Sequence, residues 1–214
     1  VLLLSLADAG KMSLRQNRVD IGEVLALLAE DIELLDPTLP VKVDMDADLI
    51  VKGDRDLLTQ VLQNLIDNAI KHNLPETSAR RWLKVEGRRQ GKTVAITVAN
   101  ASQSIPEEER DRIFDRFYRG DVSRNRKREG FGLGLSLSRE IARAHRGDLR
   151  LEKTPRGETA FTFTLPAEQL ALSTEKSIEK QSDASTKQLN SREDKQKTLP
   201  QADRKTDRKT ERVT

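Results

Sequence analysis

The sequence predicts a protein of the α/β class. Segments with apolar residues at helical spacing alternate along the chain with short runs rich in β-branched residues. Two pairs of these runs are joined by short glycine-containing turns, which is typical of β-hairpins. The apolar residues cluster in the first three quarters of the 214-residue chain, which is long enough for one domain with extensions.

The composition excludes several classes of protein. The 38 basic and 35 acidic residues leave a net charge of only +3, which does not indicate nucleic-acid binding. The chain has no cysteine, so it has neither a disulfide scaffold nor thiolate metal sites. The apolar start at 1–10 is far shorter than the roughly 20 residues of a membrane span. It also lacks the basic start and cleavage site of a signal peptide. Because the first residue is not Met, we expect a fragment or a processed form.

The first half of the chain contains three predicted helices. Residues 1–11 indicate the end of an apolar-faced helix that stops at Gly10. Residues 19–35 predict a second helix, with Asp20 as N-cap, that ends before two prolines. Asp54 caps a third, longer helix. Two short strands around an acidic turn are expected between the second and third helices, at 41–45 and 49–53.

The second half predicts two hairpins and a helix. The hairpins comprise 82–89 with 93–100, and 149–153 with 159–166. Pro106 and the three glutamates after it predict a helix start, because acids favour the positive end of the helix dipole. An Arg-rich stretch at 115–129 is expected to be a long mobile loop that leads into a glycine-led helix. The polar segment 168–214 is expected to be disordered, because it cannot bury enough apolar surface to offset chain entropy.

One stripe of the long helix carries polar residues that suit a bound phosphate group. Asn64 and Asn68 lie one turn apart, and Lys71 follows almost one turn later on the same side. Asn is a poor helix former, although a solvent-facing stripe would also tolerate it. Amide oxygens suit a hard cation such as Mg²⁺ that also holds phosphates, and a lysine neutralises a phosphate oxygen.

The glycines at 130, 132 and 134 supply a complementary feature. They lead directly into a helix, whose free N–H groups and positive dipole end form an anion site. Glycine also permits a positive φ and a close backbone approach. A dinucleotide-binding fingerprint would need a preceding strand, and a P-loop would need Gly-Lys-Ser/Thr after the glycines; neither is present.

The order of these motifs resembles the catalytic, ATP-binding domain of bacterial sensor histidine kinases, within the wider GHKL ATPase group. The resemblance covers about residues 1–166. It is carried by four segments in the same order and spacing: NLIDNAIKH (64–72), IPEEERDRIFDRFYRGD (105–121), GFGLGLSLSREIARAHRGDL (130–149) and TAFTFTLP (159–166). It implies a two-layer, Bergerat-type α/β sandwich with a mixed sheet and helices on one face.

The resemblance also implies roles for individual residues. Asn64 and Asn68 belong to the N box that holds Mg²⁺ and the triphosphate, Lys71 contacts phosphate, and His72 lies against the nucleotide. The remaining implied positions belong to the F box (Phe114, Phe117, Tyr118), the ATP lid (Arg116, Arg119, Arg124), the glycine box with the residue after it (Gly130, Gly132, Gly134, Leu135) and the neighbourhood of adenine (Thr159).

One box departs from the family pattern. Where the family has Asp-x-Gly-x-Gly, this chain has NASQS, with Asn100 in the place of the aspartate that accepts from the adenine amino group. An amide oxygen still accepts a hydrogen bond, but without the charge that strengthens it. The difference is about 1–2 kcal/mol, or roughly tenfold in affinity. Heavy-metal-sensing kinases resemble this chain in carrying Asn here. Serines in place of both glycines also restrict positive-φ turns.

The phosphoacceptor histidine of the family is not found in this sequence. His72 lies in the N box, and His145 occupies the place of a structural histidine before a glycine turn. Residues 1–16 look like the end of a dimerisation helix and its linker, so the chain alone should not phosphorylate itself. Trp82 is interpreted as a packing anchor and the glutamates at 107–109 as dipole-compensating acids. The Arg-rich stretch at 116–128 is interpreted as a phosphate contact rather than a plain solvated loop.

The sequence therefore predicts three parts: a linker at 1–16, a catalytic ATP-binding domain at 17–167 and a charged tail at 168–214. The expected activity is transfer of the γ-phosphoryl group of Mg-ATP to a histidine of a dimerisation domain, in a cytoplasmic homodimer that serves a response regulator. Contact with nucleic acid is not expected, and contact with a membrane only through a missing upstream segment. A regulatory module with weak or no nucleotide binding is the alternative. A hydrolytic GHKL ATPase is disfavoured, because Asn64 stands where such an enzyme needs an acid.

Overall fold

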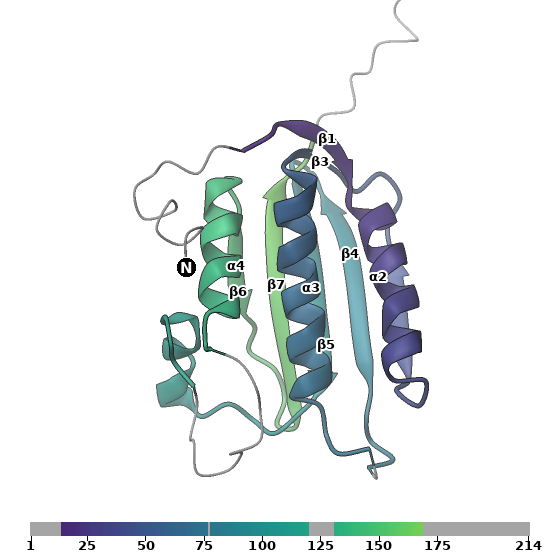
Figure 1. Cartoon of the computed structure of the whole chain (residues 1–214), viewed down its shortest axis with the longest axis vertical. Coiled ribbons are helices and arrows are strands. Elements are labelled where there is room, and N and C mark those ends of the chain that lie inside the picture. Colours follow the sequence, from purple (N-terminus) through teal and green to yellow (C-terminus); the bar gives the residue numbers. More distant parts are fainter. Residues whose placement is uncertain (1–13, 77, 120–130, 169–214) are drawn as a thin grey trace, which may run out of the picture. The chain divides into compact units, whose positions relative to one another are not determined.

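The computed structural model shows a five-stranded sheet covered on one face by three helices (Figure 1). It describes residues 14–76, 78–119 and 131–168. The expected two-layer α/β sandwich is confirmed. Its elements are β1 (Asn17–Asp20), α2 (Ile21–Leu35), β2 (Val41–Met45), β3 (Ile50–Gly53), α3 (Arg55–Lys71), β4 (Leu83–Gln90), β5 (Thr93–Ala101), the 3-10 turns η1 (Glu107–Glu109) and η2 (Arg112–Phe114), α4 (Gly134–Ala144), β6 (Asp148–Leu151) and β7 (Glu158–Pro166).

The main sheet is mixed and has the order β2-β4-β5-β7-β6. β2 runs parallel to β4, and the other neighbours are antiparallel. Both predicted hairpins are present, β4–β5 turning at Gly91 and β6–β7 near Gly157, and both glycines have a positive φ. β5 and β7 pair along their full length, from Thr93 opposite Pro166 to Ala101 opposite Glu158. The ends of these two strands are therefore held in fixed register.

Helix α3 lies in the middle of the helical layer, between α2 and α4 (Figure 1). Its N-cap is Asp54, whose side chain accepts from the N–H groups of Asp56 and Leu57, as the sequence predicts. One stripe of the helix faces the core and is buried: Leu58, Val61, Leu62, Leu65, Ile66 and Ala69. This stripe anchors α3 on the sheet, so that its half-buried and exposed residues face α4 and solvent.

One N-terminal prediction needs correction, and another is completed by the sheet pairing. The helix predicted at 19–35 begins only at Ile21, because Val19 is buried and pairs with Val51 in a two-stranded sheet of β1 and β3. The strands predicted at 41–45 and 49–53 are present, but they belong to different sheets. β2 finds its partner in β4 across the core, while β3 pairs with β1.

The helix predicted at Pro106 is also shorter than expected. Pro106 precedes a single 3-10 turn at Glu107–Glu109, and a second such turn follows at Arg112–Phe114. Neither turn has a buried residue, so no apolar stripe supports a longer helix.

Several predicted features lie outside the described residues. They are the helix end at 1–11, the loop beyond Arg119 with Arg124, Gly130, and the tail from 169 onward. Within the described ranges, none of the helices combines the length and apolar character that a membrane crossing requires.

The end of α2 carries an ion pair that makes stability depend on pH. The side chain of Arg81 donates to Asp36, and both side chains are largely buried. This hydrogen bond lowers the pKa of the Asp36 carboxyl below its ordinary value. A lowered pKa in the folded state stabilises the protein above the unfolded pKa of about 4, and the contribution is lost as pH falls through the folded pKa.

We expect Asp36→Asn to destabilise the protein by about 1–3 kcal/mol at neutral pH, because the Arg81 guanidinium loses its carboxylate. The gap between wild type and variant should narrow progressively below about pH 4. Urea unfolding of both proteins at several pH values measures this gap. A gap that stays constant down to about pH 3 would contradict the assignment.

Candidate nucleotide site

The N-box stripe of α3 faces the start of α4. The Asn64 amide nitrogen donates to the Gly134 carbonyl oxygen at 3.2 Å and to the Ser138 hydroxyl at 3.1 Å. Both donor hydrogens are thus used within the protein, and the amide oxygen stays available as a ligand. Asn68, one turn further on, is half-buried and its side-chain amide makes no hydrogen bond with any described residue, while Lys71 is exposed. The two amides and the cation therefore share one side of the helix, as predicted.

The start of α4 presents free backbone donors. Its N-cap is Leu133, which supplies no side-chain hydrogen bond, and its first turn contains no acid. The first N–H bonded within the helix is that of Leu137, which donates to Leu133. Among the described residues, the N–H groups of Gly134, Leu135 and Ser136 have no acceptor, and they lie at the positive end of the helix dipole. This helix start, which lies opposite Asn64, therefore has the free donors that the predicted anion site requires.

Gly132 joins the glycine segment to the F box. Its φ is +67°, and its carbonyl accepts from the Phe117 N–H at 2.9 Å. A Cβ placed on Gly132 would lie 2.7 Å from the Tyr118 carbonyl oxygen and 2.9 Å from the Phe117 carbonyl carbon. The positive φ at Gly132 is as predicted, and the close neighbour that the structure shows there is the F-box backbone.

Aromatic and arginine side chains fix the F box against the fold. The Phe114 ring meets Phe161 edge-on, with the ring centroids 6.2 Å apart, and the Arg139 guanidinium lies 4.6 Å from the Phe114 centroid. Arg112 lies at the same distance over Tyr118. Burial raises the pKa of the Tyr118 hydroxyl, so this group is neutral at physiological pH. The F box is thus anchored as far as Tyr118.

The far end of the site is formed by the paired ends of β5 and β7. Asn100 is 3% exposed and stands opposite Thr159, on the sheet face that also buries Val98 and Phe161. The Asn100 amide nitrogen donates to the Ala101 carbonyl at 2.9 Å, which leaves its oxygen as an acceptor. Asn100 and Thr159 therefore point toward the helical layer.

Backbone contacts bring the end of α3 to these strand ends. His72 is the exposed C-cap of α3, Asn73 forms a β-bridge with Ser102, and the Leu74 N–H donates to Ala101. The stripe of α3 and the acceptor on Asn100 are consequently parts of one region of the molecule. The predicted phosphate side and base side lie at the two ends of this region.

Segment 101–104, which departs from the family's Asp-x-Gly-x-Gly pattern, does not need glycine for its backbone conformation. None of its residues has a positive φ, so serine causes no backbone strain there. The Ser102 N–H donates to the Gly157 carbonyl at 2.9 Å, and the Gly157 N–H donates to the Ser104 hydroxyl at 3.1 Å. The Ser102 and Thr159 hydroxyls are 2.6 Å apart. The turn of the last hairpin therefore holds this segment in place.

His145 has the structural role expected from the sequence. Its Nε2 accepts from the Asp54 N–H at 3.0 Å, so the proton is on Nδ1, which donates to the Ile141 carbonyl at 2.8 Å. The ring is buried and fills the space beside Gly53. His145 thus ties the end of α4 to the start of α3.

The sequence did not predict the supporting roles of three residues at the site. Ser138 holds Asn64, Ser102 holds Thr159, and Asn73 fixes the chain after α3 by donating to Trp82 and accepting from Leu74. Ser138 does lie four residues after Gly134, on the same side of α4, but short hydroxyl residues are common on helices. Their roles depend on contacts between distant segments.

The domain has the two layers and the glycine-led helix start that are expected of the ATPase class. These features are the order of the sheet, the helices that cover it and the start of α4. Residues 53–169 match the family of histidine kinase-, DNA gyrase B-, and HSP90-like ATPases, and the chain belongs to this family. The predicted resemblance to histidine kinase catalytic domains is confirmed by named relatives and solved structures.

Several relatives are sensor kinases. Sensor histidine kinase WalK of Bacillus subtilis is 39% identical over 121 residues, which are 56% of this chain and 20% of that protein. Sensor-like histidine kinase SenX3 of Mycobacterium tuberculosis is 36% identical over 129 residues, 60% of this chain and 30% of that protein. The probable sensor protein PcoS of Escherichia coli is 33% identical over 165 residues, 77% of this chain and 34% of that protein. The chain thus spans a third or less of the length of WalK and SenX3 and about a third of PcoS.

Solved structures show the same fold. The catalytic domain of histidine kinase ThkA superposes with a TM-score of 0.61 at 27% identity, over 73% of this chain and 99% of that one. The mycobacterial sensor histidine kinase MprB superposes with a TM-score of 0.62 at 24% identity, over 72% of this chain and 99% of that one.

Proposed function

We propose that this chain is the catalytic part of a sensor histidine kinase, which binds Mg-ATP and transfers the γ-phosphoryl group to a histidine of a dimerisation domain. The observation that carries the proposal is the contact of Asn64 with Gly134 and Ser138, which sets amide oxygens against an uncapped helix start. The relatives' names support the reaction class. In the transfer, the bond from the γ-phosphorus to the bridging oxygen breaks, a phosphorus–nitrogen bond forms, and ADP leaves.

The site residues take the following proposed roles on the phosphate side. Asn68 and Asn64 offer oxygen ligands to Mg²⁺, which takes few protein ligands and fills its shell with phosphates and water. Bound Mg²⁺ would neutralise phosphate charge as it develops during transfer. Other phosphate contacts come from Lys71, Arg119, and the backbone of Gly130, Gly132, Gly134 and Leu135.

The base side has fewer polar groups. Asn100 accepts from the adenine amino group through its free amide oxygen, with Thr159 beside it and His72 against the nucleotide. Since positioning and charge stabilisation dominate phosphoryl transfer, the rigid register of β5 and β7 is an asset. The ordinary backbone of 101–104 speaks against a degenerate regulatory module.

We extend the proposal to the organisation of the whole protein. Residues 17–167 form the catalytic domain, 1–16 link it to a dimerisation helix, and 168–214 are a tail. The full protein is a homodimer that acts in the cytoplasm with a response regulator. ThkA, whose catalytic domain resembles this chain, has been solved in complex with the response regulator TrrA.

Two measurements test the proposal. Calorimetric titration with Mg-ATP asks whether nucleotide binds, and labelled ATP with a phosphoacceptor-containing dimerisation domain in trans asks whether histidine receives the phosphoryl group. We expect binding and acid-labile label on the dimerisation domain. Binding only at millimolar concentration or above, with no transfer, would favour the regulatory module instead.

Asn100→Asp should tighten ATP binding. A carboxylate accepts from an amino group more strongly than an amide does, so we expect a gain of about tenfold in affinity. The lost donor to Ala101 costs little, because Ala101 keeps the Leu74 N–H. The empty variant should unfold at a lower temperature than wild type, since its buried carboxylate is unpaired. Unchanged or weaker ATP binding would place the base away from Asn100.

A further inference from the structure

The outer face of α2 exposes two large apolar side chains. Leu27 is 57% exposed and Leu34 is 81% exposed, and a spacing of seven residues puts them on the same side of the helix. Other apolar residues of α2, such as Val24, Leu25 and Ile32, are buried. A single exposed leucine is ordinary, but two in line on one helix form the kind of patch that marks a contact surface.

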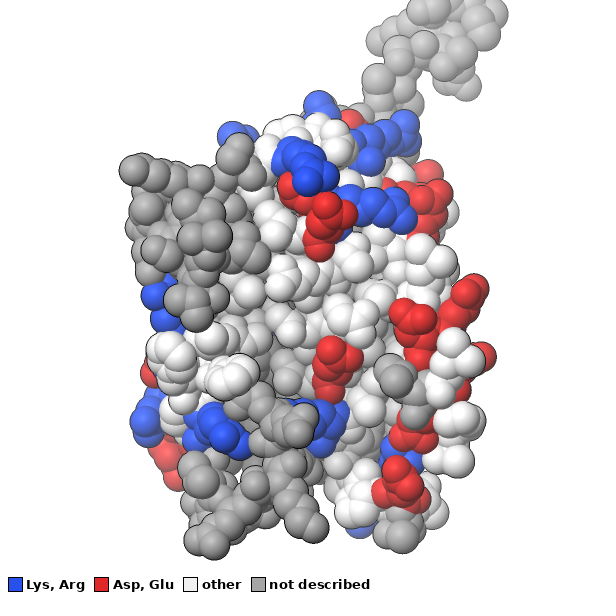
Figure 2. Space-filling model, viewed as in Figure 1, with Lys and Arg blue, Asp and Glu red and all other residues white. Residues whose placement is uncertain are grey.

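Acidic residues surround these leucines, and most of them have no basic partner among the described residues. α2 contains Glu23, Glu30, Asp31 and Glu33 and no lysine or arginine. Glu23 lies 3.6 Å from Arg55, whereas the other three make no ion pair with any described residue. Figure 2 shows acidic side chains gathered over α2, at the right of the view.

The position of these acids is unfavourable for the helix itself. Glu30, Asp31 and Glu33 lie in its C-terminal half, near the negative end of the dipole, and the last turn has no basic residue. Acidic residues near the C-terminal end of a helix, with no contact that compensates for their charge, point to a role outside the helix.

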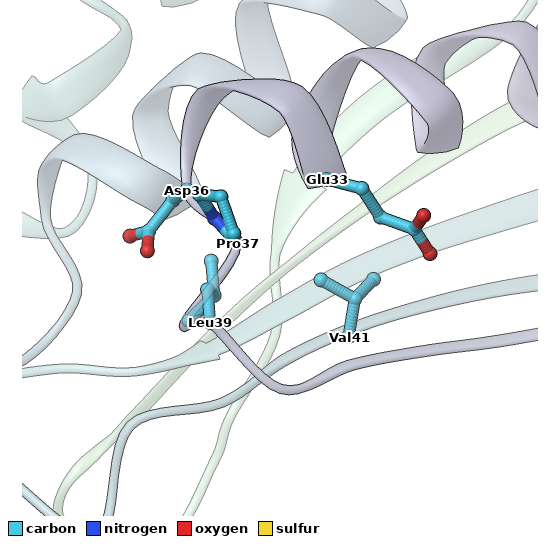
Figure 3. Close-up of a pocket in the computed structure, with 5 residues that line it drawn as sticks. All are labelled: Glu33, Asp36, Pro37, Leu39 and Val41. Carbon is cyan, nitrogen blue, oxygen red and sulfur yellow. The ribbon is translucent and has the colours of Figure 1, made fainter.

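A hollow at the end of α2 continues this surface. It is lined by Glu33, Asp36, Pro37, Leu39 and Val41, and in Figure 3 the Glu33 carboxylate lies on the Val41 side, away from Asp36. Asp36 is held by Arg81, so Glu33 is the carboxylate left for a ligand. The lining combines the apolar side chains of Pro37, Leu39 and Val41 with a polar surface that includes the Glu33 carboxylate. Such a mixed lining matches the aliphatic stem and cationic head of a lysine or arginine.

We propose that this α2 face, defined by Leu27, Glu30, Asp31, Glu33 and Leu34 with the adjoining hollow, docks a basic segment of a partner protein. Apolar side chains of that segment would cover the two leucines, and one lysine or arginine would enter the hollow. Charge complementarity selects this occupant. A second copy joined face to face would oppose acid to acid, and an anionic lipid surface would be repelled.

The surface is separate from the proposed nucleotide site. α2 lies on one side of α3, and α4, whose start forms the anion site, lies on the other (Figure 1). Binding at α2 can therefore be measured without nucleotide, and its failure would leave the proposed kinase function untouched.

Synthetic peptides test the proposal on the full chain. The probe is a helical Leu/Lys peptide of about 14 residues with its leucines on one side. One control peptide has the same composition in scrambled order, and another has Glu in place of Lys. The matched protein variants are Glu33→Lys and the double variant Leu27→Ser, Leu34→Ser. Glu108→Lys, on the exposed η1 turn, makes the same charge change elsewhere. Fluorescence anisotropy gives the affinities, and thermal unfolding verifies that each variant is folded.

We expect the patterned basic peptide to bind, and both α2 variants to weaken it by about tenfold or more while Glu108→Lys does not. Equal binding of the scrambled peptide would show charge attraction alone and overturn the proposal. Unchanged affinity in folded α2 variants would overturn it as well. So would dimerisation of the wild-type chain that Leu34→Ser abolishes, because the occupant would then be a second copy.

Discussion

Asn68→Ala is expected to lower phosphoryl transfer to a dimerisation domain by about 10²–10³-fold, because one preorganised charge-stabilising group is removed. Asn68 is half-buried beside Asn64 on α3, and its side-chain amide makes no hydrogen bond with any described residue. Removing it therefore leaves the packing of α3 intact, since the buried stripe of that helix lies on another side. The rate should fall because Mg²⁺ loses a ligand at the triphosphate.

Gln63→Ala is the matched control for this variant. It removes an amide from the same helix, but the Gln63 side chain donates to Asp67 at 3.0 Å rather than facing α4. Transfer by this control should stay within about twofold of wild type. Labelled ATP with the dimerisation domain in trans measures both rates. Wild-type transfer by Asn68→Ala, or an equal loss in both variants, would show that the metal is held elsewhere.

Local signals in the sequence identified most of the secondary structure. Asp20 and Asp54 are N-caps as predicted, because an N-cap is decided by a few neighbouring residues. β1 was missed because Asn17–Asp20 has no strand signal of its own and depends on pairing with β3, whose residues lie 30 to 36 positions further along the chain. The parallel pairing of β2 with β4 is likewise a long-range choice.

In the candidate site, too, some residues could be predicted from local spacing and others depend on contacts between distant segments. The stripe of Asn64 and Asn68 was readable because helical spacing alone puts the two residues on one side. Ser138 was not, since nothing near it in the chain reveals that Asn64 will donate to it from α3. Residues 101–104 show the converse, because the loss of glycines suggested strain, whereas the backbone there has no positive φ and is held by hydrogen bonds with Gly157. Sequence thus identifies residue types suited to the chemistry, while tertiary contacts decide their geometry.

Gly132→Ala is expected to weaken Mg-ATP binding by about tenfold or more. Two effects combine at this position. A positive φ costs an alanine about 1 kcal/mol. In addition, the new Cβ would meet the backbone of Phe117 and Tyr118 at 2.7–2.9 Å, so the glycine segment and the F box must move apart. The hydrogen bond from Phe117 to Gly132 would break, and the segment that leads into the uncapped start of α4 would shift.

Gly91→Ala separates the two effects. Gly91 has a φ of +59°, close to the +67° of Gly132, but a Cβ there would meet nothing within 4 Å. It should therefore cost about 1 kcal/mol of stability and leave nucleotide affinity unchanged. Thermal unfolding and Mg-ATP titration of both variants provide the comparison. If Gly132→Ala behaves as Gly91→Ala does, glycine is needed at 132 only for its backbone angle. If only Gly132→Ala loses affinity, the contact between the F box and the glycine segment shapes the nucleotide site.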